Sequence, residues 1–247
     1  MWPQRWLGVA YSRLYSRFRE GRFTSGDIVA VAGTREKAKA IAARLQKAGL
    51  MCRHSKRGRK MVYRLIDPET LVLMASGLVS GLTGIRQQVY RRLAGLACSA
   101  MLRDVQGLHS VVLYGSVARG RAKPESDLDL LVVADFTQHF AARLDALIRL
   151  ERSRGIAEEL SILEEDGIRT HLSFLPLTVR ELEAAPPILL DIVDEGIPLL
   201  DDDAFSRVAL EVTRRLRSSG ARRVFIGEDD WYWDLKPDYV FGEVIQV

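Results

Sequence analysis

Two acidic residues near the middle of the chain are spaced for metal binding. Asp127 and Asp129 stand at the start of "DLDLLVV", whose run of large apolar residues predicts a buried strand. Because side chains alternate along a strand, both carboxylates should project from the same face. Two carboxylates this close repel each other unless a cation joins them, and Mg²⁺ prefers oxygen ligands. The pattern therefore predicts a divalent-metal site.

A stretch suited to phosphate binding precedes this pair. The sequence "HSVVLYG" predicts another buried strand, which ends at Gly115 and Ser116, where "VARG" begins a short helix. Backbone N–H groups at the start of that helix, together with the Ser116 hydroxyl, suit an anionic phosphate. A metal site beside a phosphate-binding turn is what phosphoryl or nucleotidyl transfer requires. The alternative is that the aspartates serve only as turn and capping residues.

The stretch "GSVARGRAKPESDLD" resembles the signature of the DNA polymerase β-like nucleotidyltransferase superfamily in its minimal form. That signature is Gly-Ser, a spacer of this length, and then Asp-x-Asp. The resemblance implies that Gly115, Ser116 and Arg119 contact the nucleotide. It also implies that Asp127 and Asp129 ligate Mg²⁺ and are the catalytic residues. The implied cofactors are Mg²⁺ and an NTP, with ATP as the expected one.

One part of the family pattern is missing. The resemblance runs from residue 108 to about residue 200, and active members usually carry a third carboxylate on a following strand. The candidate strand here, "RTHLSFLPL" over residues 169–177, has no Asp or Glu. His171 or Ser173 would occupy the position, and neither cleanly replaces an oxygen ligand of a hard cation.

Two functions therefore stay open. The first is a Mg²⁺-dependent nucleotidyltransferase that moves an NMP from an NTP to an unidentified hydroxyl acceptor. The second is a catalytically weak or inactive nucleotide-binding protein that acts as a DNA-binding regulator or in an antitoxin-like role. The intact Gly-Ser and Asp-x-Asp favour the first, and the missing carboxylate favours the second.

The N-terminal part of the chain carries most of the positive charge. Residues 1–66 contain 16 Lys and Arg against 3 Asp and Glu, whereas residues 67–247 contain 20 against 29. Such clustering points to a polyanion such as DNA as a partner of residues 1–66. The alternative is an ordinary solvated face on a unit that mediates dimerisation or protein contact.

Periodicity in this basic region predicts three helices and a hairpin. The helices are expected over residues 5–20, 23–33 and 34–49, and two strands within residues 50–66 should meet at Gly58. Thr24 is the expected N-cap of the second helix, with Asp27 completing a capping box. This order resembles a winged helix-turn-helix. The residues expected to contact DNA phosphates are Lys39, Lys47, Lys56, Arg57, Arg59 and Lys60.

The predicted fold class is α/β (α+β), in three parts. A winged helix-turn-helix-like domain spans residues 1–66, and a helical linker spans residues 67–106. A polymerase β-like nucleotidyltransferase domain spans residues 107–247, with a small mixed sheet, flanking helices, a C-terminal helix and an extended tail. In the linker, a helix over residues 85–107 should place Arg91 and Arg92 on its solvated side.

The cysteines and the hydropathy of the chain limit the cellular location and the kinds of partner that we expect. Neither Cys52 nor Cys98 belongs to a CxxC pair, and no run approaches eighteen apolar residues. We therefore expect a cytoplasmic protein with no membrane partner. Minimal nucleotidyltransferases are often paired with small helical toxin proteins, so such a protein is one expected partner. A second copy of the chain is another.

Overall fold

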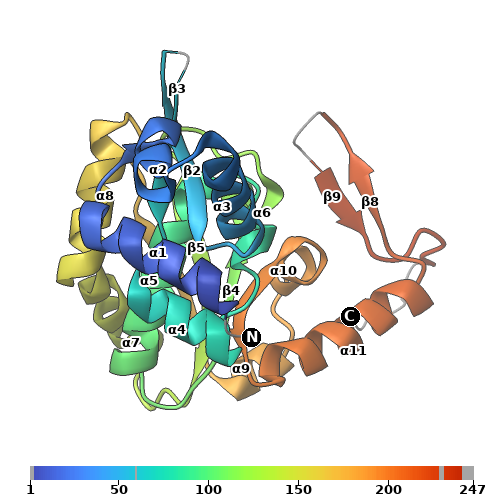
Figure 1. Cartoon of the computed structure of the whole chain (residues 1–247). Helices are drawn as coiled ribbons and strands as arrows, with labels where there is room; N and C mark the ends of the chain where they lie inside the picture. The colour runs from blue at the N-terminus through green and yellow to red at the C-terminus, as the bar shows by residue number, and fades with distance from the viewer. Residues whose placement is uncertain (1–2, 59, 228–230, 241–247) are drawn as a thin grey trace.

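A four-stranded sheet forms the centre of the molecule, with helices on both of its faces (Figure 1). The computed structural model describes residues 3–58, 60–227 and 231–240. The strands, in the order β6-β5-β4-β7, are β4 (Leu108–Tyr114), β5 (Leu128–Ala134), β6 (Leu172–Leu177) and β7 (Ile197–Asp201). β4 is antiparallel to β5 and β7, and β6 is parallel to β5. The predicted mixed sheet is confirmed, with residues 197–201 as an edge strand.

Alternation of side chains along the strands builds two apolar layers. Val111 and Leu130 face one layer, whereas Val112 and Leu131 face the other. The first layer packs against α5 (Arg91–Asp104), α7 (Phe140–Ile148), η3 (Arg149–Arg152) and α8 (Arg154–Glu165). The second packs against α9 (Val179–Glu183), α10 (Leu189–Glu195) and α11 (Ala204–Ser218). Burial on both faces explains why these strands read as continuous apolar runs.

Residues 5–65 form a smaller assembly with its own sheet, which we call the N-terminal unit. Its elements are α1 (Arg5–Phe18), β1 (Phe23–Thr24), α2 (Ser25–Ala32), α3 (Arg35–Lys47), β2 (Met51–Arg57) and β3 (Lys60–Leu65). The strands pair in the order β1-β3-β2. Thr24 and Asp27 make the predicted capping box at the start of α2. The expected three helices and hairpin are confirmed in this part of the chain.

The segment between the N-terminal unit and β4 is less regular than the sequence pattern predicts. It contains α4 (Pro68–Ser76), the 3-10 turns η1 (Leu82–Gly84) and η2 (Gln88–Tyr90), and α5. The single helix predicted over residues 85–107 is therefore wrong at its start. Cys98 on α5 is fully buried, and this burial raises the pKa of its thiol to about 12. Such a thiol is a packing residue and a poor nucleophile.

The prediction that Arg91 and Arg92 are solvated is wrong. Both are buried, and Arg92 donates through Nε to Oε2 of Glu159 on α8 over 3.0 Å. Arg64 on β3 donates through Nη1 to the other oxygen of Glu159 over 2.6 Å. Arg92 also pairs with Glu20. Residues from four separate segments thus form a charge cluster where the N-terminal unit meets the central sheet domain.

Part of the predicted extended tail forms a hairpin instead, and residues 241–247 of that tail lie outside the described residues. β8 (Arg222–Phe225) and β9 (Trp231–Asp234) form an antiparallel hairpin, which stands at the side of the body (Figure 1). The indole N–H groups of Trp231 and Trp233 both donate to Oδ1 of Asp191 on α10. These long-range bonds attach the hairpin to α10. Among the described residues, no helix has the length and apolarity needed to cross a membrane.

Candidate functional site

The Gly-Ser pair stands where β4 turns into a short helix, α6 (Gly115–Arg119), as predicted. Gly115 has a φ of +71°, in the left-handed region that favours glycine. A Cβ at this position would lie 2.2 Å from Oδ2 of Asp129. The backbone of the Gly-Ser turn and the second aspartate therefore lie in direct contact, which only a residue without a side chain permits.

The two aspartates lie at the same end of the sheet as this turn. Asp129 is on β5, paired with Tyr114 on β4 and with Ser173 on β6. Asp127 precedes β5, is exposed, and accepts a hydrogen bond from the backbone N–H of His171 over 3.3 Å. The structure thus brings together the Gly-Ser turn and both predicted metal ligands, from residues separated by a loop in the sequence.

The electrostatics at Asp129 favour a bound cation. Its half-burial raises the pKa of the carboxyl above the ordinary value, and the neighbouring charge of Asp127 raises it further. A hydrogen bond from Ser173 and the positive charge of Arg119 act in the opposite direction without offsetting the rise. A divalent cation at this pair would remove the repulsion.

The place of the family's third carboxylate is decided by the parallel register of β5 and β6. Ser173 lies directly opposite Asp129 and hydrogen-bonds to its carboxylate. His171 lies before β6, is exposed, and has Nδ1 3.6 Å from Oε2 of Glu151. Of the two predicted occupants, Ser173 is the one whose side chain bonds to Asp129, whereas His171 contacts Asp127 through its backbone N–H. Among the described residues, no three His, Cys, Asp or Glu side chains are grouped to hold a metal ion.

Arg119, expected to contact the nucleotide, has its guanidinium engaged by the protein. Its Nη1 donates to Oε2 of Glu195 on α10 over 3.1 Å. The same guanidinium lies over the ring of Trp231, 5.2 Å from the centroid. Arg119 is nevertheless close enough to Asp129 to lower its pKa. It therefore lies between the aspartate pair and the C-terminal hairpin.

Gln87 is a residue of this site that sequence reasoning missed. Its side chain donates to the carbonyl of Ala122 over 2.9 Å and accepts from the Ala122 N–H over 2.8 Å. Ala122 belongs to the loop that joins the Gly-Ser helix to the aspartates. The neighbouring Gln88 accepts from the N–H of Arg53 on β2 over 2.9 Å. A polar side chain in a helix-linker pattern gave no signal that it would hold a loop 35 residues away.

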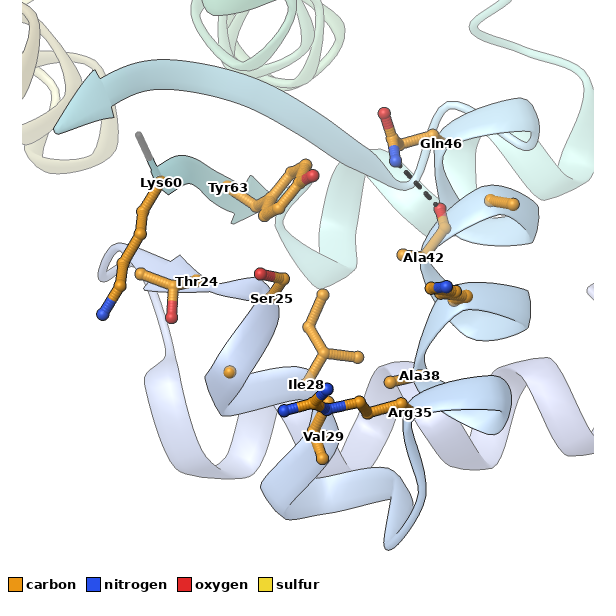
Figure 2. Close-up of a pocket in the computed structure, with 13 residues that line it drawn as sticks. Thr24, Ser25, Ile28, Val29, Arg35, Ala38, Ala42, Gln46, Lys60 and Tyr63 are labelled. Carbon is orange, nitrogen blue, oxygen red and sulfur yellow. Dashed lines mark hydrogen bonds between the residues drawn. The ribbon is translucent and has the colours of Figure 1, made fainter. Parts of the chain in front are cut away.

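The second candidate surface is a groove on the N-terminal unit, of about 530 Å³. Figure 2 shows it between α2, α3 and β3, with an apolar floor that includes Ile28, Ala38 and Ala42. Arg35 and Lys60 are among the cations that line it. The groove therefore combines apolar and cationic groups, and α3 supplies part of both.

The predicted DNA-contacting residues do not all lie in this groove. Lys39 and Lys60 line it, whereas Lys47 and Lys56 are exposed but are not among its lining residues. Arg59 and the side chain of Arg57 lie outside the described residues. The structure therefore brings together Lys39 and Lys60, from α3 and β3, at one groove.

Comparison with known families decides the class of the central domain. Residues 99–197 match the family model of the nucleotidyltransferase domain. This part of the chain is a nucleotidyltransferase domain. The match includes the Gly-Ser turn, both aspartates and Ser173, and it leaves out the N-terminal unit and the C-terminal hairpin. No curated protein matches the chain significantly.

Several solved structures are similar to the chain at low identity. One is a toxin-antitoxin complex with AMP-PNP, at 20% identity and a TM-score of 0.34, covering 50% of this chain and 88% of that chain. Another is a tri-AMPylated Shewanella oneidensis HEPN toxin in complex with MNT antitoxin, at 18% identity and a TM-score of 0.29. The latter match covers 48% of this chain and 82% of that one.

Proposed function

We propose that the nucleotidyltransferase domain transfers an NMP from an NTP, ATP in the first instance, to a hydroxyl acceptor. The hydroxyl oxygen bonds to the α-phosphorus and loses its proton, the α–β phosphoanhydride bond breaks, and pyrophosphate leaves. The observation that carries this proposal is the direct contact between the Gly115 backbone and the Asp129 carboxylate. Phosphate groups bound at the Gly-Ser turn would lie beside the negative charge of Asp129, and a cation between them would compensate both. Gly115 and Ser116 would bind the phosphates, and Asp127 and Asp129 are the proposed catalytic residues.

The residues at the aspartate pair fit a Mg²⁺ ion. Both carboxylates are hard oxygen donors, and Asp129 has a raised pKa because burial and Asp127 oppose its charge. When bound, Mg²⁺ would compensate charge on the phosphates during transfer. The chain's own contribution is to hold the carboxylates at the turn. Gln87 would keep the connecting loop in place through Ala122.

The test is Mg²⁺-dependent binding and turnover of NTPs. Calorimetry with ATP should detect binding that needs Mg²⁺ and is lost in the double variant Asp127→Asn/Asp129→Asn. Label from α-labelled NTPs should pass to an acceptor in the wild type only. A matched control is Asp145→Asn, an exposed carboxylate on α7 outside the site. Binding that survives the double variant would remove the aspartates from the proposal.

A second candidate function is a nucleotide-binding protein that turns over slowly or not at all. The observation that favours it is Ser173, which stands opposite Asp129 where the family usually supplies a carboxylate. In that case Ser173→Asp should raise label transfer when an acceptor is supplied. His171→Asp is the control, because the imidazole of His171 lies beside Glu151 and the register partner of Asp129 is Ser173. Robust transfer by the wild type would exclude the inactive form.

We also infer that residues 1–66 are a winged helix that binds DNA through its phosphates. The order of elements in the N-terminal unit, with the long β2-β3 hairpin after α3, supports this inference. The cations at the groove, Lys39 and Lys60, would meet the backbone together with Lys47 and the hairpin cations Lys56, Arg57 and Arg59. Phosphate contacts make binding salt-dependent and insensitive to sequence.

This part of the proposal has its own experiment. Replacing Lys56 and Lys60 with alanine should weaken binding to all DNA sequences alike. Each lost phosphate contact should reduce the salt slope by about 0.9. Lys236→Ala, outside the N-terminal unit, is the control. If the Lys56 and Lys60 variant keeps its affinity for DNA in a low-salt titration, these residues do not contact DNA phosphates.

The remaining parts of the proposal concern place and partners. We propose that the protein works in the cytoplasm. If it is an antitoxin, we propose that a small helical toxin-like protein is the partner that it modifies or inhibits. A homodimer is the other assembly we consider. Co-purification with a candidate small helical toxin-like protein tests the first assembly, and sedimentation of the isolated chain tests the second.

A further inference from the structure

The C-terminal hairpin is fixed on the nucleotidyltransferase domain at one side of its site. Arg223 on β8 pairs with Glu195 over 2.5 Å and with Asp194 over 3.0 Å, both on α10. Trp231 and Trp233 on β9 donate to Asp191 over 3.2 and 2.9 Å. These contacts give the hairpin a defined position. The family match ends at residue 197, so the hairpin lies outside it.

A cavity of about 490 Å³ lies between this hairpin and the C-terminal end of α6. We call it the hairpin cavity, and its lining includes Arg86, Arg119, Arg121, Phe225 and Trp231. Phe225 is 64% exposed, and its ring centroid is 6.2 Å from that of Trp231. An aromatic side chain this exposed contributes little to the core, yet it stands at the mouth of a cavity.

The cavity combines the two chemistries that bind nucleotides. Aromatic faces stack on nucleobases, and guanidinium groups attract phosphate and stack on rings. The carboxylates that also line it, Asp194 and Glu195, are paired with Arg223, and Glu195 with Arg119 as well. Their charge is therefore balanced within the protein. Arg86 is exposed at the cavity and packs beside Gly120.

The position of the cavity relative to the Gly-Ser turn suits one nucleotide. The same helix, α6, begins at the proposed phosphate site and ends with Arg119 at the cavity. Five helical residues span about 7 Å, a distance that a ribose and base can bridge from a bound phosphate. A base in the cavity would lie against Phe225 while its phosphates remained at Gly115 and Ser116.

We propose that the hairpin cavity binds a nucleobase, with Phe225 as the stacking residue. This inference rests on the proposed nucleotidyl transfer and deepens it. The base belongs either to the donor NTP or to the terminal nucleotide of a single-stranded acceptor. Both sources present the same kind of ring to Phe225. Removing the ring of Phe225 should weaken the binding of the NTP in the first case and of the single-stranded acceptor in the second.

The experiment is calorimetry on the full chain with three probes in the presence of Mg²⁺. The probes are ATP, inorganic tripolyphosphate and a single-stranded oligonucleotide. Phe225→Ala should weaken at least one base-containing probe by fivefold or more, the effect of a lost base stack, and leave tripolyphosphate unchanged. Phe225→Tyr should retain the affinity. The control is Phe140→Ala, since Phe140 on α7 is 46% exposed and does not line the cavity.

Each outcome bears on the proposal. Weaker ATP binding alone assigns the donor base to the cavity, and weaker oligonucleotide binding alone assigns an acceptor base. Equal loss for tripolyphosphate, or no loss for either base-containing probe, overturns the inference. If wild-type protein binds no tripolyphosphate with Mg²⁺, the proposed phosphate site itself fails. The two failures are thus distinguished by the probe that has no base.

Discussion

Two buried or half-buried carboxylates, Glu159 and Asp129, have opposite surroundings. Glu159 is 1% exposed and lies between the guanidinium groups of Arg64 and Arg92. Burial opposes its charge, but the two arginines outweigh that effect and lower its pKa. Burial raises the pKa of Asp129, and the charge of Asp127, two residues earlier, raises it further. One carboxylate is compensated by the fold, whereas the other has a like charge beside it.

This difference separates a structural charge cluster from the proposed functional site. A buried charge that the protein itself pairs contributes to holding segments together, and its removal leaves its partners unpaired. A charge held near a like charge opposes stability, so its presence calls for a role outside folding. The region around Glu159 joins the N-terminal unit to the central domain. The region around Asp129 faces the Gly-Ser turn. Four substitutions test this contrast.

The largest effect on stability should come from Glu159→Gln. The variant leaves Arg64 and Arg92 buried beside a neutral amide, so the free energy of unfolding should fall by about 3–5 kcal/mol. Urea denaturation measures the loss. Glu158→Gln is the control, because that exposed neighbour pairs with Arg154 on the surface and should change stability by less than about 0.5 kcal/mol. Equal losses in the two variants would contradict a special role for the buried cluster.

Gly115→Ala should have the next largest effect. A left-handed φ costs a non-glycine residue about 1–2 kcal/mol, and the new Cβ would also displace Asp129. We expect a loss of about 2 kcal/mol in unfolding and a more than tenfold loss in Mg²⁺-dependent ATP affinity. Gly77→Ala has the same backbone demand, with φ +86° and open space around the new Cβ. It should lose stability but keep ATP affinity, and a similar loss of ATP binding there would refute the contact argument.

Gln87→Ala should have a moderate effect on the site. Two hydrogen bonds to Ala122 are lost, and each contributes about 1 kcal/mol. The loop before the aspartates should loosen, and the affinity for ATP with Mg²⁺ should fall by about fivefold. Gln106→Ala, at an exposed position before β4, is the control. ATP affinities that match in the two variants would leave Gln87 without a positioning role.

Asp129→Asn should have the smallest effect on stability, and of the opposite sign. Because the folded pKa lies above the unfolded value of 3.8, the native state binds the proton more tightly. Stability therefore falls as pH rises from about 3.8 through the folded pKa. The amide avoids this loss and should stabilise the protein at pH 7 by less than about 1 kcal/mol, since water screens the half-buried site.

The same variant gives a pH test of the comparison. Urea denaturation at pH 3 should find wild type and Asp129→Asn nearly equal, because the wild-type carboxyl is then protonated. Glu159 behaves in the opposite way, since its lowered pKa supplies stability that is lost as pH falls through the folded pKa. Destabilisation by Asp129→Asn at pH 7 without metal would mean that Asp129 is paired in the fold after all.

Much of the local structure follows from the sequence alone. The apolar runs before Gly115 and after Asp127 predict β4 and β5, and the capping box at Thr24 predicts the start of α2. Each of these signals lies within a few consecutive residues, because strand alternation, helix periodicity and capping are local properties of the chain. The Gly-Ser and Asp-x-Asp residues are found for the same reason.

The contacts between distant segments were decided by tertiary structure. The burial of Arg92 depends on Glu159, 67 residues later, and the hold of Gln87 on Ala122 spans 35 residues. The parallel register of β5 and β6 places Ser173, and not His171, beside Asp129. Helical periodicity assigns an arginine to the polar side of its own helix, but only packing determines whether that side meets water or a carboxylate. The sequence by itself therefore determined which residues could do chemistry, whereas the packing of separate segments decided which of their charges are compensated.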